Sequence, residues 1–375
     1  MTYRIISGDG HVDLNWLPHD LFVDNAPAPW KDKMPHVEDS AAGPVWKANG
    51  RVMTPVGVFR SEEWTNPSGF HREKRLEEVG FSEDSRRGVY RPSDPDLRIK
   101  DQDLDGIDAE VIYGMAFGPD QVRDLEARAL VYRIYNDWAA SFSASNPGRL
   151  ACLACLPHHS PQAAADELRR AAGLGLRGAE FRAGLASIPI FHREWDVLWE
   201  ASVECNMPLS FHLLENLPKT KEPREREYLD VYWSVLLTMA QLDGIEHLSC
   251  ILLSGACERF PDFKFVLGEA GIGWIPYVID RMDHESEGIR GLSMKPSAYW
   301  RRQGFSTFQK EGIAGDILSL VGEDNVMWGN DYPHNDCVWP DSLETIEFNL
   351  KGLQDPSARR KVVCENAGRL YGFLN

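Results

Sequence analysis

The stretch 3–11, YRIISGDGH, is the segment from which both the fold and the chemistry of this chain can be worked out. Its apolar residues predict a short buried strand, and that strand runs directly into Asp9 and His11. The two side chains stand two residues apart, so in extended backbone both point to the same side. A carboxylate and an imidazole in that arrangement can bind one divalent cation together.

Beyond this strand, short apolar runs alternate with segments of helical spacing. The runs that predict strands lie at 109–113, 150–156, 176–181, 208–211, 263–267, 304–307 and 325–328. The predicted helices lie at 96–106, 120–146, 161–174, 194–205, 234–259, 275–282, 312–321, 342–350 and 356–371. Such alternation predicts a parallel sheet covered by helices, and about eight strands fit a (β/α)8 barrel. An open doubly wound sheet is the alternative, but no glycine-rich dinucleotide loop follows the first strand.

The segment at about 14–95 breaks this pattern. It is rich in proline, glycine, tryptophan and charge and shows few periodic stretches. A long irregular connection of this kind is unusual inside a compact domain, and its tryptophans require burial. We therefore expect one domain over residues 1–375, with an ordered insertion at about 14–95.

The composition restricts the partners of the protein. Hydrophobic residues make up 43% of the 375 residues and charged residues 26%, which is typical of a globular protein. The net charge of −17 disfavours binding to nucleic acid. We expect no membrane span and no signal peptide, because we find no apolar run of about 18 residues and no apolar core at the start of the chain. Seven cysteines without a regular spacing indicate reduced thiols and a cytoplasmic location.

Other candidate ligands follow predicted strands in the same way as Asp9 and His11. His212 ends the strand at 208–211, Glu269 follows the strand at 263–267, and Asp331 follows the strand at 325–328. The carboxyl ends of all strands in a parallel barrel open onto one face, where the first and last strands are neighbours. Taken alone, His212 could be a buried structural histidine and Asp331 a turn cap. Together these residues predict a catalytic metal site with an open position.

Six stretches also carry a resemblance to a known family. They are DGH at 9–11, KDQDLDGIDAE at 100–110, PLSFH at 208–212, GEAGIGWIP at 268–276, WGNDYPH at 328–334 and CENAGRLYG at 364–372. They resemble the amidohydrolase superfamily, in the amidohydrolase-related branch that includes aminocarboxymuconate-semialdehyde decarboxylase and the resorcylate, salicylate and carboxyvanillate decarboxylases. The resemblance covers the first strand and most of the chain after residue 95.

The resemblance implies a distorted TIM barrel that holds one divalent metal. Asp9, His11, His212 and Asp331 match the positions of the metal ligands. Zinc is the first choice, and manganese or iron also fits. No lysine stands at a strand end where it could bridge two metals, so one ion is expected. Relatives in this branch are commonly dimers, so a homodimer is expected.

One position departs from the family pattern. Many decarboxylases of this branch have a catalytic histidine at the end of the sixth strand, where this chain has Glu269. Glutamate can act as a base, but its negative charge would disfavour a nearby substrate carboxylate unless it is protonated. The alternatives are a partner that orients a ligand histidine, or a cap for the following helix.

The reaction is left open between three interpretations. The first is hydrolysis of a C–N or C–O bond in a small aromatic or cyclic substrate, with Asp331 moving the proton of a metal-activated water and Glu269 assisting. The second is non-oxidative decarboxylation of a hydroxylated aromatic acid, with Asp331 protonating the ring carbon. The third is a catalytically silent barrel that only binds. Arg182 and His159 are the candidate substrate-binding residues, although Arg182 could instead pair with a structural carboxylate and His159 could lie on a surface loop.

Overall fold

The computed structural model describes residues 3–41, 43–57, 78–115, 119–212, 221–334 and 336–374. The predicted strands are present and run parallel to their neighbours. They are β1 (Ile6–His11), β5 (Ala109–Tyr113), β6 (Leu150–Cys152), β7 (Ala154–Cys155), β8 (Ala179–Glu180), β9 (Leu209–His212), β10 (Phe265–Gly268), β11 (Gly304–Phe308) and β12 (Val326–Trp328). They form two sheets, ordered β1-β5-β6 and β12-β11-β10-β9-β8-β7.

The two sheets adjoin each other at both of their edges. Only Leu153 separates β6 from β7. The backbone N–H of Leu153 donates to a carbonyl of β5 in the first sheet. The backbone N–H of the next residue, Ala154, donates to the carbonyl of Gly178, just before β8 in the second sheet. At the other edge, the backbone N–H of Asp331 donates to the Asp9 carbonyl at 2.9 Å. One continuous segment thus serves both sheets, and the first strand lies beside the chain that follows the last strand.

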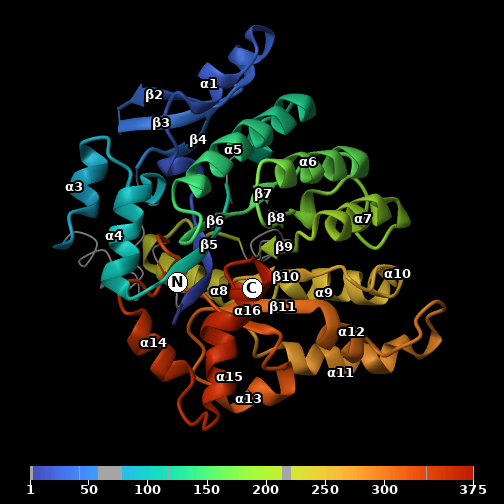
Figure 1. The fold of residues 1–375 in the computed structure, drawn as a ribbon. Coiled ribbons are helices and arrows are strands. Elements are labelled where there is room, and N and C mark those ends of the chain that lie inside the picture. The colour runs from blue at the N-terminus through green and yellow to red at the C-terminus, as the bar shows by residue number, and fades with distance from the viewer. Residues whose placement is uncertain are drawn as a thin grey trace.

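Helices lie outside the strands (Figure 1). They are α4 (Pro95–Asp105), α5 (Leu125–Ser145), α6 (Pro161–Gly173), α7 (Asp196–Cys205), α8 (Leu229–Ala240), α9 (Gly244–Leu253), α10 (Ala256–Arg259), α11 (Ile275–Glu285), α12 (Pro296–Gln303), α13 (Ala314–Val321), α14 (Ser342–Asn349), α15 (Pro356–Arg360) and α16 (Asn366–Leu370). The side chains of Asp94, Asp124 and Ser160 accept hydrogen bonds from the first backbone N–H groups of α4, α5 and α6. These caps explain why α5 begins after Asp124 and not at residue 120, where the apolar spacing starts.

Two predicted helices are broken. The segment 234–259 contains the second half of α8, all of α9 and the short α10. The chain turns at 241–243, between α8 and α9, and adopts a left-handed conformation at Gly255 (φ 74°), between α9 and α10. The segment 356–371 is interrupted by a π-helical turn at Lys361–Glu365. By length and composition alone, Val231–Leu253 could cross a membrane, with a hydropathy of 1.3. Its division between α8 and α9 makes it weak support for a membrane span.

The predicted insertion contains regular structure in the part that the coordinates describe. It carries α1 (Leu21–Asn25), α3 (Phe81–Arg86) and an antiparallel sheet of β2 (His36–Ser40), β3 (Gly43–Ala48) and β4 (Arg51–Pro55). Trp16 and Trp46 are buried, and Trp46 packs edge-on against Phe22. Burial of these two tryptophans therefore stabilises the described part of the insertion. Residues 58–77 of the predicted insertion lie outside the described residues.

A buried ion pair fixes α4 against the first and last parts of the sheet. Arg98 and Glu110 are both fully buried and form a two-pronged contact. The Arg98 guanidinium also donates to the His11 carbonyl at 2.8 Å and lies 5.1 Å from the centre of the Tyr332 ring. Arg98 thus contacts the end of β1 and the loop after β12, which are the two segments that bring His11 and Asp331 together.

Candidate metal centre

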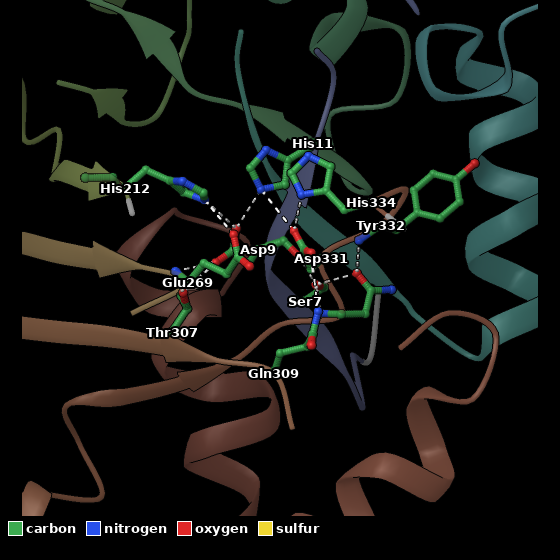
Figure 2. Close-up of polar contacts among 12 residues, drawn as sticks. Ser7, Asp9, His11, His212, Glu269, Thr307, Gln309, Asp331, Tyr332 and His334 are labelled. Carbon is green, nitrogen blue, oxygen red and sulfur yellow. Dashed lines mark hydrogen bonds and ion pairs between the residues drawn. The ribbon is translucent and has the colours of Figure 1, made fainter. Parts of the chain in front are cut away.

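The four predicted ligands and Glu269 lie at the carboxyl ends of their strands. Asp9 and His11 belong to β1, His212 is the last residue of β9, Glu269 follows β10 directly, and Asp331 follows β12 by three residues. All five are buried. Figure 2 shows their side chains directed toward one another. Residues more than 300 positions apart in the sequence therefore meet at one place, as the strand pattern predicted.

The distances between the side chains are those of a compact cluster. The His11 Nε2 atom lies 3.2 Å from Asp331 Oδ1 and 3.4 Å from Asp9 Oδ1. His212 Nε2 lies 3.9 Å from Asp9 Oδ1 and 3.5 Å from Glu269 Oε2. One ligand atom each from Asp9, His11 and His212 lies within 4.8 Å of the other two, and a second group with the same spacing consists of His11, Glu269, Asp331 and His334. His11 belongs to both groups. This spacing allows the imidazoles and carboxylates to share one ion.

The facing atoms of this cluster lack hydrogen bonds. Asp9 Oδ1, His11 Nε2 and Asp331 Oδ1 are inaccessible to solvent and make no hydrogen bond of proper geometry within the described ranges, although His334 Nδ1 forms an ion-pair contact with Asp331 Oδ1 at 2.9 Å. Leaving a buried polar atom unsatisfied costs about 1–3 kcal/mol, and more for a charged group. A cation bound between these atoms would satisfy them all. Two imidazoles and two carboxylates are a ligand set for zinc, manganese or iron, so the residues fit one divalent ion.

The other oxygen of each carboxylate is bound by the protein. Asp9 Oδ2 accepts hydrogen bonds from the Thr307 hydroxyl at 2.5 Å and from the backbone N–H of Glu269 at 2.8 Å. Asp331 Oδ2 accepts from the Gln309 side-chain amide at 3.3 Å. In each carboxylate one oxygen therefore accepts hydrogen bonds from the protein, and the second oxygen faces the cluster. This arrangement preorganises a metal site.

The backbone conformation supports the same geometry. Glu269 and Asp331 have φ values of 51° and 59°, in the left-handed region that residues with a side chain seldom adopt. Both residues follow a strand, and the conformation turns the chain sharply there. In Glu269 the turn accompanies the hydrogen bond from its N–H to Asp9. Strained backbone of this kind is concentrated at functional sites.

The charges of the cluster shift the pKa values of its members. Burial and the charge of His334 oppose protonation of His11, yet Asp331 and Asp9 outweigh them and raise its pKa to about 9. Burial also disfavours the ionised form of Asp331, but His334 and His11 lower the pKa of this carboxyl overall. Burial and the charge of Asp331 raise the pKa of Glu269 well above its usual value. Burial and the charge of His11 lower the pKa of His212 to about 4. The carboxylates of Asp9 and Asp331 thus favour a positive charge within the cluster, and a metal ion can supply that charge.

Three residues at the site were not assigned such contacts from the sequence. Thr307 and Gln309 bind the ligand carboxylates, and His334 stacks on His11 with ring centres 4.0 Å apart. His334 stands three residues after Asp331 in WGNDYPH. No local sequence signal distinguishes Thr307 or Gln309, because their contacts depend on the neighbouring strand.

The two candidate substrate residues lie at the same ends of their strands. Arg182 follows β8 by two residues and is half-buried. His159 lies between β7 and α6, and its Nε2 atom is 3.8 Å from Glu126 Oε1 of α5. Neither is a member of the clusters whose ligand atoms lie within 4.8 Å of one another. Substrate binding by these two residues stays a prediction.

Comparisons with known proteins identify the family of this chain and proteins of similar sequence and structure. Residues 89–373 match the family model described as amidohydrolase. A gamma-resorcylate decarboxylase of Polaromonas sp. strain JS666 is 25% identical over 298 residues, which cover 74% of this chain and 86% of that relative. An amidohydrolase structure from Mycobacterium avium subsp. paratuberculosis K-10 superposes with a TM-score of 0.77 at 18% identity, covering 99% of this chain and all of that one. A dihydroxybenzoic acid decarboxylase of Polaromonas sp. JS666, with bound manganese and 2-nitroresorcinol, superposes with a TM-score of 0.62 at 20% identity, covering 84% and 95%.

Proposed function

This chain is an enzyme of the amidohydrolase family, and from that premise we propose that it removes carbon dioxide from a hydroxylated aromatic acid. One divalent cation would be held by Asp9, His11, His212 and Asp331. The observation that carries the proposal is the set of buried, unsatisfied ligand atoms at the strand ends. The reaction class is supported by the decarboxylase relatives, one of which is similar over most of its length.

Hydrolysis was the first interpretation of the sequence, and the relatives support decarboxylation better. Two gamma-resorcylate decarboxylases and a 2-amino-3-carboxymuconate-6-semialdehyde decarboxylase share 23–26% identity with this chain. The ligand residues suit either reaction, because both need a Lewis acid beside a group that moves protons. The two reactions must therefore be distinguished by which substrates the protein turns over.

We also infer that the parallel strands, with β6 and β7 counted as one continuous segment, close into an eight-stranded barrel that makes residues 1–375 one domain. The hydrogen bond between Asp331 and Asp9 supports this closure, because it connects the first strand to the chain after the last. The continuous segment 150–155 supports it at the other edge. A homodimer and a cytoplasmic location stay predictions.

The bound ion would supply a Lewis acid that holds the substrate's carboxylate and neighbouring hydroxyl. Decarboxylation breaks the bond between the ring carbon and the carboxyl carbon and leaves the electron pair on the ring carbon. A proton must then reach that carbon. Asp331 is our candidate to deliver it, because one of its oxygens faces the ligand cluster and the other is held by Gln309. Since His334 and His11 lower the pKa of its carboxyl, Asp331 must first take up a proton, and Glu269, whose pKa is raised, is the neighbour that can give one. Glu269, 3.5 Å from His212, is the second group that can hold a proton there.

The test is a substrate panel assayed in heavy water. Purified protein is incubated with 2,6-dihydroxybenzoate, carboxyvanillate and other hydroxylated aromatic acids, and separately with aromatic lactones, esters and amides. Decarboxylation predicts carbon dioxide release and a product with deuterium at the former carboxyl position, detected by NMR. Acid production from a lactone, ester or amide, without carbon dioxide release from any acid, would replace this proposal by hydrolysis.

The identity of the metal is part of the same proposal. The sequence favoured zinc, with manganese or iron as alternatives, and one structural relative holds manganese. Two imidazoles and two carboxylates suit each of these ions. Elemental analysis of the active protein, followed by reconstitution of the chelated protein with each ion, identifies the one that restores turnover.

A further inference from the structure

His334 contacts both a predicted metal ligand and a carboxylate outside the ligand set. Its Nδ1 atom lies 2.9 Å from Asp331 Oδ1, and its Nε2 atom lies 2.9 Å from Asp13 Oδ2. Its ring also stacks on His11, with an angle of 27° between the ring planes. Figure 2 shows His334 beside His11, with its contact to Asp331 drawn.

Burial makes these contacts energetically important. Asp13 is 1% exposed and His334 is 6% exposed, so little water screens the charges between them. Asp13 lies two residues beyond the end of β1, so the partner of His334 follows His11 closely in the chain. A buried carboxylate that holds one ring nitrogen fixes the orientation of an imidazole, and with it the direction of the other nitrogen.

We propose that Asp13 and His334 form a positioning pair that orients Asp331 and His11 as metal ligands. The proposal rests on the proposed metal site and goes beyond it, because neither residue is among the four proposed ligands. His334 also lies in a group of ligand-type side chains with His11, Glu269 and Asp331, and its contact with Asp13 through Nε2 favours the positioning role. His334 sets the position of the Asp331 carboxylate through Nδ1 and restricts the His11 ring by stacking, while Asp13 holds His334 in place through Nε2. Gln309 holds the opposite oxygen of Asp331, so the carboxylate is constrained from two sides.

A simpler role is support of the turn that carries Asp331. The backbone N–H of His334 donates to the Asp331 carbonyl at 2.9 Å, and this bond does not involve the side chain. A substitution of the side chain leaves it in place. The two roles therefore predict different results for side-chain variants.

Two substitutions separate the two ends of the imidazole. His334→Asn places an amide near the position of Nδ1 and can keep a polar contact with Asp331. His334→Gln places its amide near the position of Nε2 and can keep the contact with Asp13, but loses the one with Asp331. Asp13→Asn weakens the pair from its other end while retaining an oxygen that accepts from His334. Exposed His284 of α11, changed to Asn and to Gln, provides the matched control.

The first readout is metal affinity without substrate. Chelated protein is titrated with Zn²⁺ and, separately, with Mn²⁺ in competition with a chromophoric chelator. Loss of such a supporting partner typically weakens metal binding or activity by about 10–100-fold. We expect a weakening in this range for His334→Gln, a smaller one for His334→Asn and Asp13→Asn, and affinities within about twofold of wild type for the His284 controls.

The second readout is the split between kcat and KM on the substrate found in the panel. We expect kcat to fall in the same order while KM changes by less than about threefold, with thermal unfolding of the metal-free variants close to that of the wild type. Equal losses in His334→Asn and His334→Gln, or unchanged metal affinity in all three variants, would overturn the proposal. If His334→Gln does not fold, Asp13→Asn decides by the same criteria.

The metal titration separates this inference from the proposed reaction. A wild-type protein that binds metal but decarboxylates nothing would end the proposed function, while the affinities of the variants still judge the positioning pair. A wild-type protein that binds neither ion would overturn the pair together with the site.

Discussion

Replacing Thr307 by valine tests whether the contacts behind the ligands govern metal binding. The threonine side chain is completely buried, and its hydroxyl donates to Asp9 Oδ2 at 2.5 Å. Valine has nearly the same shape, so the substitution removes the donor with little change in packing. Asp9 Oδ2 would keep one donor, the backbone N–H of Glu269 at 2.8 Å.

The size of the effect follows from the charge of the acceptor. A hydrogen bond to a charged group contributes about 1.5–3 kcal/mol. A difference of about 1.4 kcal/mol corresponds to tenfold in a dissociation constant. Because the Glu269 N–H remains, we expect the lower end of this range. Thr307→Val should therefore weaken metal binding by about tenfold, and Thr307→Ser, which keeps the hydroxyl, by less than about threefold.

The assay is a titration of metal-free protein with Zn²⁺ in competition with a chelator, supported by thermal unfolding with and without the ion. The metal-free serine variant should unfold within a few degrees of the wild type. The metal-free valine variant should unfold at a lower temperature, because the hydrogen bond to Asp9 forms without the ion, and the further loss of stabilisation by Zn²⁺ reports the effect on binding. A valine variant that binds Zn²⁺ within twofold of the wild type would refute the reasoning. So would a serine variant that loses as much affinity as the valine variant.

Other predictions concern the reaction and the fold. Asp331→Asn should abolish turnover while the protein remains folded by circular dichroism; near-normal activity would contradict its assigned role. Glu269→Gln should lower kcat without emptying the metal site, and loss of metal on elemental analysis would instead make Glu269 a ligand. Arg98→Met should lower the free energy of unfolding by about 3–5 kcal/mol in urea titrations, because Glu110 is left buried without its cationic partner and keeps, among the residues described, only the Gln102 amide as a side-chain donor; a change below about 1 kcal/mol would contradict that account. Chelation should lower the unfolding temperature and re-addition of the ion should restore it, whereas an unchanged temperature at saturating metal would argue against binding to the folded state.

The parts of the fold that depend on local pattern were predictable from the sequence. The β1 strand and the alternation after residue 95 follow from apolar runs of strand length between amphipathic helices, and both are present. The single helix expected at 234–259 was wrong, because apolar spacing continues across the turn at 241–243 and hides it. The interruption at Lys361–Glu365 was missed for a similar reason, since a π-helical turn leaves the apolar pattern almost unchanged.

Some residues of the site were likewise predictable from the local sequence pattern, whereas others depend on contacts between distant parts of the chain. Asp9 and His212 could be placed at strand ends from the pattern alone, and the structure brings them together. Thr307 could not be recognised, because it is one polar residue in a short strand and its importance comes from its neighbour β1. The side-chain role of His334 likewise depends on Asp13, more than 300 residues earlier in the chain.

Elemental analysis of purified protein, wild type beside His11→Ala, tests the central claim most directly. If the four proposed ligands hold one divalent ion, the wild type contains about one equivalent of zinc, manganese or iron per chain, and the variant contains much less at equal folded concentration. Turnover that persists in a wild-type preparation without stoichiometric divalent metal would contradict the account.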